Sequence, residues 1–596
     1  MDKNKLIGLA LISILLIVYT HFFDNKLPKI AQQTTNTQQL PHSTPNIQLQ
    51  TSEAILNLQT GIFAKASQGV SKDIILENKD IRVTLSSQGA KVKEVILKQY
   101  KDYQGQPLKL LDEQSNSMEF EFVSNQATIN TGALFFNTED SDQHIQQAAT
   151  GKVTFILPLG TDQYLQHIYT LPSEGYALTQ SWEFVGADTY IDQGKINFVW
   201  HDFIKRAEKD IQACRNKTTI NYYLANKSFK HLKEHTEQQE EQNIQTPIQW
   251  LAIKQRFFTA GIFTDQPFET GNILLKPTTQ PDKFVKEAHV KLSLASNNTP
   301  QPIQKGIFKF YFGPNTYKDL NSFAQGFSKN LPLGWPVVKW INQYFIIPIF
   351  SFIEKYVSNY GLVILILVLF IKLLLLPLSY KSYISMAEMK VLKPTLDALK
   401  ARHGGDMQSI QMEQVKLYRE MGINPLSGCI PVLLQMPILL AMFNFFPNAI
   451  ELRQKAFLWA PDLSTYDSII NLPFVIPFYG SHVSLFTLLM TASTLLYTWS
   501  SNQVNAPQGP MKSMSYLLPI TFMFILNSFP AGLSFYYFVS NLFTFAQQTL
   551  IKRFVDEEKI KAKLAKNKEK AVNKESSFKK RFQDAIKASA SHKGKK

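Results

Sequence analysis

Cysteine is scarce in this sequence, which has two in 596 residues and no CxxC or Cys/His pattern. Cys214 lies in a polar stretch and Cys429 beside an apolar one, so neither a disulfide framework nor a structural zinc site is expected. The Walker A, GxSxG and HExxH motifs are also missing, and His231 and His235 have no evident third ligand. We therefore expect no enzyme activity, no cofactor and no metal site.

Carboxylates are absent from the long apolar segments. A hydrocarbon core about 30 Å thick needs roughly 20 apolar helical residues, and local thinning of the bilayer accommodates shorter spans. The segments that qualify are 6–23, 361–378, 430–446, 483–499, 514–529 and 530–551. None of them contains Asp or Glu, although 514–529 is short and contains Pro519. Ion-coupled carriers usually need carboxylates within the membrane, so this absence argues against a transporter.

Basic residues are present but unevenly distributed. Residues 379–427 contain seven Lys and Arg, residues 447–482 contain two, and residues 552–596 contain 16 against six Asp and Glu. The positive-inside rule therefore places 379–427 and the basic tail in the cytoplasm. With six spans both termini lie inside, so we predict a multi-domain membrane protein with a six-span α-helical bundle, N-in and C-in.

Three regions are predicted before the second span. Residues 1–23 begin with two lysines and lack an A-x-A cleavage site, which favours a signal-anchor span over a cleaved signal peptide. Residues 24–73 are rich in Gln, Thr, Asn and Pro and predict a flexible linker. Residues 74–326 alternate apolar and polar residues in short runs, such as Ile81–Leu85 and Ile307–Phe312, so we predict an all-β sandwich outside the membrane.

The rest of the chain contains a membrane core and a basic tail. Residues 331–356 mix Trp and Tyr with polar side chains, which predicts an amphipathic helix at the membrane interface. Residues 357–552 contain five spans and a cytoplasmic helical hairpin at 381–421, whose alternative role is that of a plain connector. Its methionines are expected to be exposed, and apolar positions that recur at helical spacing predict a contact surface: Met386, Met389, Leu392 and Leu396. The tail, 553–596, suits nucleic acid or anionic lipid.

Lys372 is a single cation in an otherwise apolar segment. An intramembrane lysine costs from about 3 to over 10 kcal/mol and usually faces protein or water. Lys372 lies toward the cytoplasmic end, so snorkelling to the headgroups is the alternative. Because the spans supply no carboxylate partner, we predict a water-filled groove in which a substrate brings the missing anion.

Uncharged polar and aromatic side chains in other spans can line the same groove. They are Gln435, Asn444, Thr487, Thr491, Thr494, Ser534, Tyr536, Tyr537, Ser540, Asn541 and Thr544. The alternative for each is structural, since Ser and Thr often bond across helices and aromatic rings pack.

Several stretches resemble the YidC/Oxa-type membrane protein insertases, most densely over 355–552. They are 377–390, 424–431, 434–437, 451–453, 529–541 and 547–548. The resemblance implies a five-helix core around a groove open to cytoplasm and lipid, in which a cation attracts acidic parts of the substrate. The family usually has arginine where this chain has Lys372, so the charge is kept but the bidentate fork is lost.

The same resemblance implies roles for other regions. Tyr536 and Tyr537 match substrate-contacting positions, the hairpin at 381–421 receives the nascent chain, and the basic tail touches ribosomal RNA. The β domain resembles a periplasmic supersandwich related to sugar mutarotases, in a bacterial inner-membrane protein that works alone or with the Sec translocon. The rival functions are a small-molecule transporter or channel, and a carbohydrate-binding protein. A transporter predicts paired intramembrane charges or inverted repeats, and a carbohydrate-binding protein would need only one anchor span.

Overall fold

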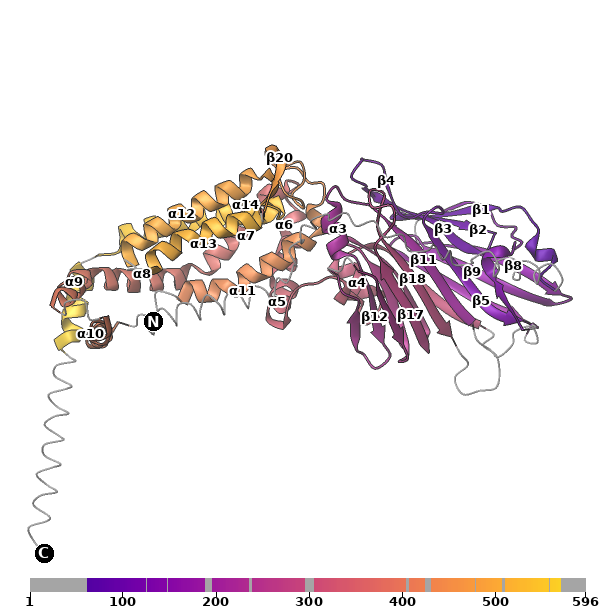
Figure 1. The fold of residues 1–596 in the computed structure, drawn as a ribbon, viewed down its shortest axis with the longest axis horizontal. Helices are drawn as coiled ribbons and strands as arrows, with labels where there is room; N and C mark the ends of the chain where they lie inside the picture. The colour runs from indigo at the N-terminus through magenta and orange to yellow at the C-terminus, as the bar shows by residue number, and fades with distance from the viewer. Residues whose placement is uncertain are drawn as a thin grey trace, which may run out of the picture. The chain divides into compact units, whose positions relative to one another are not determined.

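The computed structural model describes residues 62–569, apart from 125, 147, 188–195, 235–237, 295–304, 403–406, 424–429, 478, 506–509 and 557 (Figure 1). The chain divides into two compact units, Met1–Leu331 and Pro332–Lys596. The predicted signal anchor, most of the predicted linker and residues 570–596 of the predicted tail lie outside the described residues.

The first unit is a β domain. Its strands are β1 (Asp73–Glu77), β2 (Ile81–Ser86), β3 (Lys91–Lys101), β4 (Pro107–Leu111), β5 (Asn116–Ser124), β6 (Ala127–Asn130), β7 (Gln143–His144), β8 (Thr150–Gly160), β9 (Gln163–Pro172), β10 (Ala177–Val185), β11 (Ile196–Lys205), β12 (Thr219–Leu224), β13 (Phe229–His231), β14 (Glu240–Ile244), β15 (Ile248–Lys254), β16 (Phe258–Phe268), β17 (Thr270–Lys276), β18 (Phe284–Leu294) and β19 (Lys305–Pro314). Its short helices are η1 (Lys65–Ser67), η2 (Thr131–Ala133), α3 (Ile211–Lys217), α4 (Tyr317–Phe323) and η5 (Phe327–Asn330).

These strands form three sheets within the described part of the unit. The eight-stranded sheet has the order β13-β12-β15-β16-β19-β10-β9-β8, and the six-stranded sheet the order β14-β17-β18-β11-β5-β6. The five-stranded sheet has the order β4-β3-β2-β1-β7, with β1 and β7 parallel and the other neighbours antiparallel. Figure 1 shows the neighbouring strands β11, β18 and β17 side by side.

The core of the β domain lies between two sheets. Every second residue of β11 is buried, as expected for a strand with one face against the core. Phe120 on β5 and Phe198 on β11 contact Phe308 on β19, with ring centroids 5.6 and 6.1 Å apart. Because β19 belongs to the eight-stranded sheet, the two larger sheets pack face to face. The predicted all-β sandwich is confirmed.

The second unit is mainly helical. Its elements are α5 (Pro336–Ile341), η6 (Asn342–Ile346), α6 (Ile347–Glu354), α7 (Tyr360–Leu374), α8 (Leu376–Val391), α9 (Lys393–Arg402), α10 (Met407–Glu420), α11 (Ile430–Phe445), η8 (Phe446–Asn448), η9 (Ile450–Leu452), β20 (Ile470–Ile476), β21 (Gly480–Val483), α12 (Leu485–Asn505), α13 (Pro510–Leu526) and α14 (Ala531–Phe554). Helices α11, α12, α13 and α14 coincide with the predicted spans 430–446, 483–499, 514–529 and 530–551 to within six residues at each end. Residues 558–569 are also helical.

A sharp bend separates α7 from α8. The two helices are joined at Leu375 and meet at 60°. Pro377 has no backbone N–H, and its ring excludes the carbonyl of the preceding turn, so a straight helix cannot continue through it. The helix that covers the predicted span 361–378 therefore ends earlier, at Leu374. The predicted hairpin 381–421 consists of α8, α9 and α10, and it begins inside α8.

The length and apolarity of the described helices do not confirm six spans. The segment Pro336–Glu354, made of α5, η6 and α6, is long and apolar enough to cross a membrane, while α7 and α8 qualify together as one bent pair. The first of these segments is the one predicted to lie at the interface. Its interfacial position, the span count and the orientation stay predictions.

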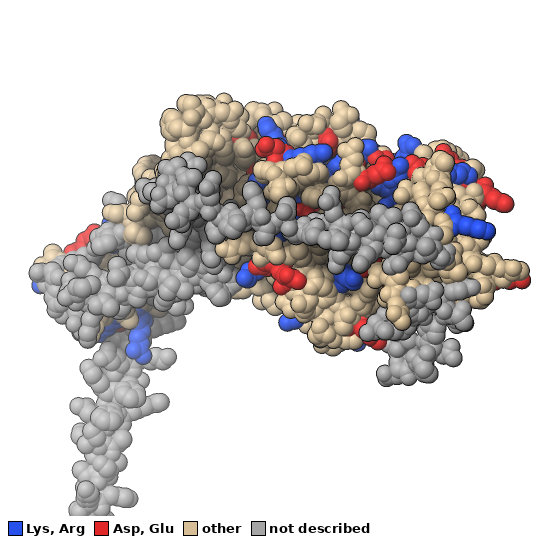
Figure 2. Space-filling model, turned by 45° about the vertical axis from the view of Figure 1, so that its right-hand side comes forward, with Lys and Arg blue, Asp and Glu red and all other residues tan. Residues whose placement is uncertain are grey.

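The two units differ in the side chains they expose. Figure 2 shows many Lys, Arg, Asp and Glu side chains over the β domain. The helical unit exposes large apolar side chains on several helices, including Phe370, Leu373, Leu496, Trp499, Leu517, Leu542 and Leu550. Apolar side chains on the outside of a helical unit are suited to lipid rather than water.

Candidate functional site

Lys372 is buried near the end of α7, with 5% of its surface exposed. Its Nζ donates a hydrogen bond of 2.8 Å to Thr544 Oγ1 on α14, and the Thr544 hydroxyl donates in turn to the Ser540 carbonyl at 2.8 Å. Gln547 Nε2 donates to the Lys372 carbonyl at 3.1 Å, which ties the two helices at the same level. The position of the lysine is therefore set by α14.

The ammonium of Lys372 has capacity for more partners. A lysine carries three donors, and among the described residues only Thr544 accepts from it. No carboxylate of the described residues lies within 4.0 Å of its Nζ. A buried cation with a neutral partner is unfavourable unless a further anion or water is supplied. The site is thus electrostatically incomplete in a way that suits an acidic ligand.

Tyr536 and Tyr537 have different surroundings. Tyr536 is 3% exposed, belongs to the apolar core of the helical unit and lies with its ring 5.6 Å from that of Phe446. Tyr537 is half-buried, and its ring lies 5.6 Å from Phe443 on α11. Of the two, Tyr537 is better placed to contact a substrate, and Tyr536 supports it through an edge-to-face contact.

Two other predicted groove residues, Asn444 and Asn541, have separate partners. Asn541 donates to Ser493 Oγ at 3.1 Å and to Thr494 Oγ1 at 2.8 Å, so it joins α14 to α12. Asn444 donates to the Leu440 carbonyl of its own helix at 2.8 Å. Gln435 is half-buried on α11, nine residues and roughly 13 Å before Asn444 along the helix. The structure thus links Lys372 to the Ser540 carbonyl through Thr544, whereas Asn444 and Asn541 have contacts of their own.

Thr544 was predicted as one of many polar residues that can line the groove, but its contact with Lys372 was not predicted. It stands among many hydroxyl side chains in the spans, and nothing in its type marks it as the partner of Lys372. Helical spacing offers a signal in retrospect, because Tyr537, Ser540, Thr544 and Gln547 recur every three or four residues and so share one face of α14. Two residues of that face, Thr544 and Gln547, contact Lys372 on α7.

A buried polar network at the start of α12 was not predicted. Asp467 is 1% exposed, and its carboxylate accepts hydrogen bonds from the Trp459 indole at 2.8 Å, the Phe486 backbone N–H at 3.0 Å and the Ser484 hydroxyl. Fully buried Asn527 accepts from the Ser484 N–H at 3.0 Å. The network caps α12 and fixes the loop before it to the end of α13.

The hairpin residues are less exposed than expected. Met386 is buried with Tyr383 and Ile551. Leu392 is buried in a cluster with Leu417 and Met421, and the two remaining predicted residues, Met389 and Leu396, are half-buried against these clusters. The expectation of exposed methionines is corrected at Met386, because an apolar side chain at this position finds partners within the fold. Among the side chains of α10 that the structure describes, Met412 and Val415 are exposed, at 64% and 63%.

The start of the basic tail packs on the hairpin. Ile560 and Leu564 belong to the same cluster as Leu392, and Lys563 Nζ lies 2.7 Å from the carboxylate of Glu388 on α8. Asn567 Nδ2 donates to the Met421 carbonyl at 3.1 Å. Residues 558–569 are therefore part of the folded unit.

His167 illustrates a structural histidine in the β domain. It is 1% exposed, and its Nδ1 lies 2.7 Å from Gln180 Nε2. Burial lowers the pKa of His167 to about 3, so the imidazole is neutral at physiological pH. This side chain fills the core and offers no accessible chemistry.

The two units are those of a membrane protein that also carries a β domain. One is a β sandwich, and the other is a helical unit with apolar outer surfaces and a buried, incompletely partnered lysine. A family model described as 60Kd inner membrane protein matches residues 352–568, and one described as YidC periplasmic domain matches residues 73–348.

Two relatives extend this match over the whole chain. The membrane protein insertase YidC of Amoebophilus asiaticus (strain 5a2) is 88% identical, and the alignment covers 100% of both chains. The protein of the same name from Cytophaga hutchinsonii is 43% identical over 98% of each chain. The chain belongs to the YidC family of membrane protein insertases. This membership confirms the predicted resemblance and places the chain in the bacterial inner membrane, with its β domain in the periplasm.

Solved structures give weaker likenesses. The crystal structure of an active YidC insertase with its first transmembrane domain resolved is 18% identical, covers 84% of this chain and 99% of its own, and has a TM-score of 0.31. A putative aldose 1-epimerase from Escherichia coli K12 is 10% identical, covers 41% of this chain and 100% of its own, and has a TM-score of 0.26. Both scores are too low to support a statement about function.

Proposed function

We propose that this chain inserts nascent membrane proteins through a groove beside Lys372, using six spans with both termini in the cytoplasm. The observation that carries the mechanism is the burial of Lys372 against a neutral hydroxyl. An acidic residue of the substrate supplies the anion that the site lacks. The apolar helix of the substrate then moves into lipid, and this transfer drives release without ATP.

The helices around Lys372 support this path. On α14 the face toward α7 carries Ser540, Thr544 and Gln547, which offer hydroxyl and amide groups to a polar segment. Tyr537, nearer the start of α14, adds a ring that can cover an apolar residue. A small-molecule transporter or channel is the alternative, and the absence of any carboxylate in these helices disfavours it.

The proposed partners follow from the surfaces of the chain. Nascent membrane proteins enter from the cytoplasm, where α8, α9 and α10 receive them. The basic tail binds the ribosome and anionic lipid. The Sec translocon is a further proposed partner, for substrates whose insertion requires both the translocon and this protein.

A photo-crosslinking amino acid at Tyr537 tests the groove directly. We expect it to capture a stalled nascent chain, because Tyr537 is half-buried beside Phe443 rather than sealed in the core. The matched control is the same probe at Leu542, which is 42% exposed and roughly 140° away around α14. If the probes at the two positions capture nascent chain equally, or not at all, this face of α14 does not line a substrate groove.

Removal of residues 570–596 is expected to weaken binding to ribosomes several-fold at low salt. This segment contains nine Lys and Arg against two Asp and Glu, so it neutralises phosphates and releases counter-ions. Residues 558–569 stay in place and preserve the packing on the hairpin. Co-sedimentation with translating ribosomes at increasing salt measures the difference, which should shrink as salt rises.

A tail of equal length with its cations replaced by serine is the control for length. Binding to anionic vesicles is measured in parallel. If the truncation lowers vesicle binding but leaves ribosome binding unchanged, the tail is a lipid anchor and the ribosome is not its partner.

A further inference from the structure

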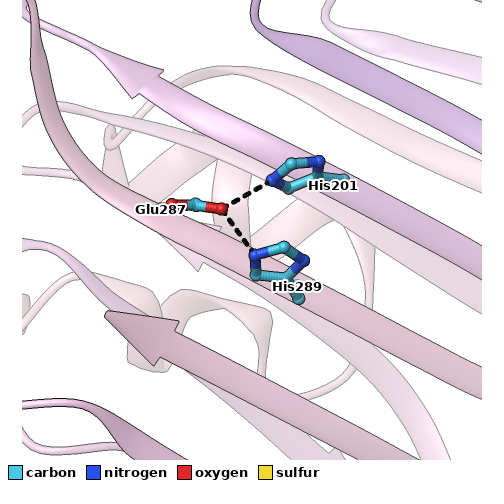
Figure 3. Close-up of side chains that lie close together, drawn as sticks. All are labelled: His201, Glu287 and His289. Atoms are coloured by element: carbon cyan, nitrogen blue, oxygen red, sulfur yellow. Dashed lines mark hydrogen bonds and ion pairs between the residues drawn. The ribbon is translucent and has the colours of Figure 1, made fainter. Parts of the chain in front are cut away.

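Two histidines and a glutamate meet on the outer face of the six-stranded sheet. His201 on β11 lies directly opposite His289 on β18 in the antiparallel register. Glu287 precedes His289 by two residues, so its side chain is on the same face of the strand. Figure 3 shows the two rings and the carboxylate converging from these neighbouring strands.

The donor atoms of these three side chains are close together. His201 Nε2 lies 3.0 Å and His289 Nε2 lies 2.7 Å from the same oxygen, Oε1 of Glu287 (Figure 3). The rings are stacked with centroids 4.0 Å apart. The side chains of His201 and His289 are 34% and 37% exposed, whereas that of Glu287 is 8% exposed. The cluster therefore has a fixed carboxylate at its base and two histidines reached from solvent.

Lys276 is the competing group. It pairs with Glu287 across β17 and β18, and its Nζ lies 3.2 Å from the same carboxylate oxygen. The Lys276 side chain is 34% exposed and long enough to turn toward water. In this arrangement one oxygen of a nearly buried carboxylate serves two imidazoles and an ammonium.

We propose that His201, Glu287 and His289 form a binding site for a divalent transition-metal ion such as Zn²⁺ or Cu²⁺. Imidazole nitrogen and carboxylate oxygen bind zinc at about 2.0–2.2 Å, which places neighbouring ligands about 3.3 Å apart in a tetrahedral site. The two histidine-to-carboxylate separations of 3.0 and 2.7 Å need to open by only a few tenths of an ångström, and all three ligand atoms lie within 4.8 Å of one another. Calcium and magnesium prefer oxygen ligands and are disfavoured by two imidazoles.

Metal binding requires two local changes. The proton on each Nε2 moves to Nδ1, which is possible because both rings reach solvent. Lys276 leaves the carboxylate, since a cation beside a metal ligand is repelled. The remaining metal position faces solvent and takes water or a side chain of another protein. The 88-residue separation of the two histidines explains why the sequence shows no metal motif.

Zinc titration of the full chain in detergent, without a histidine tag and after treatment with a chelator, tests the site. We expect one Zn²⁺ per chain, with affinity falling at least tenfold in His289→Gln. The control is His144→Gln, because His144 is exposed and lies near a single carboxylate, Glu77, at 3.6 Å. This control should bind zinc as the unaltered chain does.

Lys276→Met provides a test that does not depend on losing a ligand. Removing the competing cation should tighten zinc binding several-fold, a change that a purely structural ion-pair cluster does not predict. Cu²⁺ bound to the same protein should show two nitrogen ligands by electron paramagnetic resonance, and fewer in His201→Gln. If the unaltered chain and a folded His201→Gln/His289→Gln double variant bind zinc equally, the cluster is an ion-pair network and not a metal site.

Discussion

Replacing Lys372 with glutamate is expected to slow the insertion of substrates with acidic translocated segments by well over tenfold. Two unit charges about 8 Å apart at an effective dielectric of about 20 interact by roughly 2 kcal/mol, and reversing the sign doubles the difference. Every 1.4 kcal/mol corresponds to about tenfold in rate or equilibrium. Insertion into inner-membrane vesicles at matched protein levels measures the effect.

The choice of substrate and variant separates charge from structure. A substrate with a neutral translocated segment should insert nearly normally with the Lys372→Glu protein, because it brings no anion to the site. Thr544→Val removes the hydroxyl that accepts from Lys372 Nζ but keeps the positive charge, so insertion should be largely retained. Normal insertion of acidic substrates by a folded Lys372→Glu protein would show that the charge of Lys372 does not attract the substrate.

Lysine at position 372 bears on the specificity of the groove. An arginine would offer a planar fork of donors for bidentate contact with a carboxylate, whereas the ammonium of lysine is a compact point charge. Lys372→Arg should therefore preserve insertion. The site selects for charge rather than for one geometry, which suits substrates of varied sequence.

Asp467→Ala is expected to destabilise the helical unit by about 2–6 kcal/mol, since it leaves two buried donors without their acceptor, at about 1–3 kcal/mol each. Those donors are the Ser484 hydroxyl and the Phe486 N–H, and the partly exposed Trp459 indole loses the same acceptor. A loss of this size is comparable to the whole stability of many domains. Thermal unfolding in detergent and the yield of folded protein measure it.

Asp462→Ala is the matched control in the same loop. Its carboxylate accepts from the Ser464 N–H and hydroxyl at 2.8 Å but is half-exposed, so water can replace it. The expected loss is below about 1 kcal/mol. If the Asp467→Ala protein unfolds at the same temperature as the unaltered chain, the network does not hold α12 in place.

Local patterns explain why much of the fold was predictable. Alternating residues predicted the β sandwich, and β11 buries every second side chain as the pattern requires. Apolar runs predicted α11, α12, α13 and α14 nearly to their ends, because burial and backbone pairing depend on neighbours in the sequence. The bend after Leu374 was missed, although Pro377 was visible as a helix breaker.

The residues of the candidate site could be named from the sequence, but the contacts between them could not. Lys372 stands out because it is a charge among apolar residues. Its partner Thr544 lies 172 positions away and looks like any other hydroxyl in a span. Met386 resembled a surface residue of the hairpin, but Tyr383 and Ile551 cover it.

The sequence by itself determined the β sandwich, the position of most helices of the second unit and the family. These depend on composition and short-range periodicity, which the chain carries along its length. Tertiary structure alone decided that Lys372 contacts Thr544, that Leu564 and Lys563 pack on the hairpin, and that His201 faces His289. Each of these pairs is brought together by packing between elements, whose partners cannot be read from spacing along the chain.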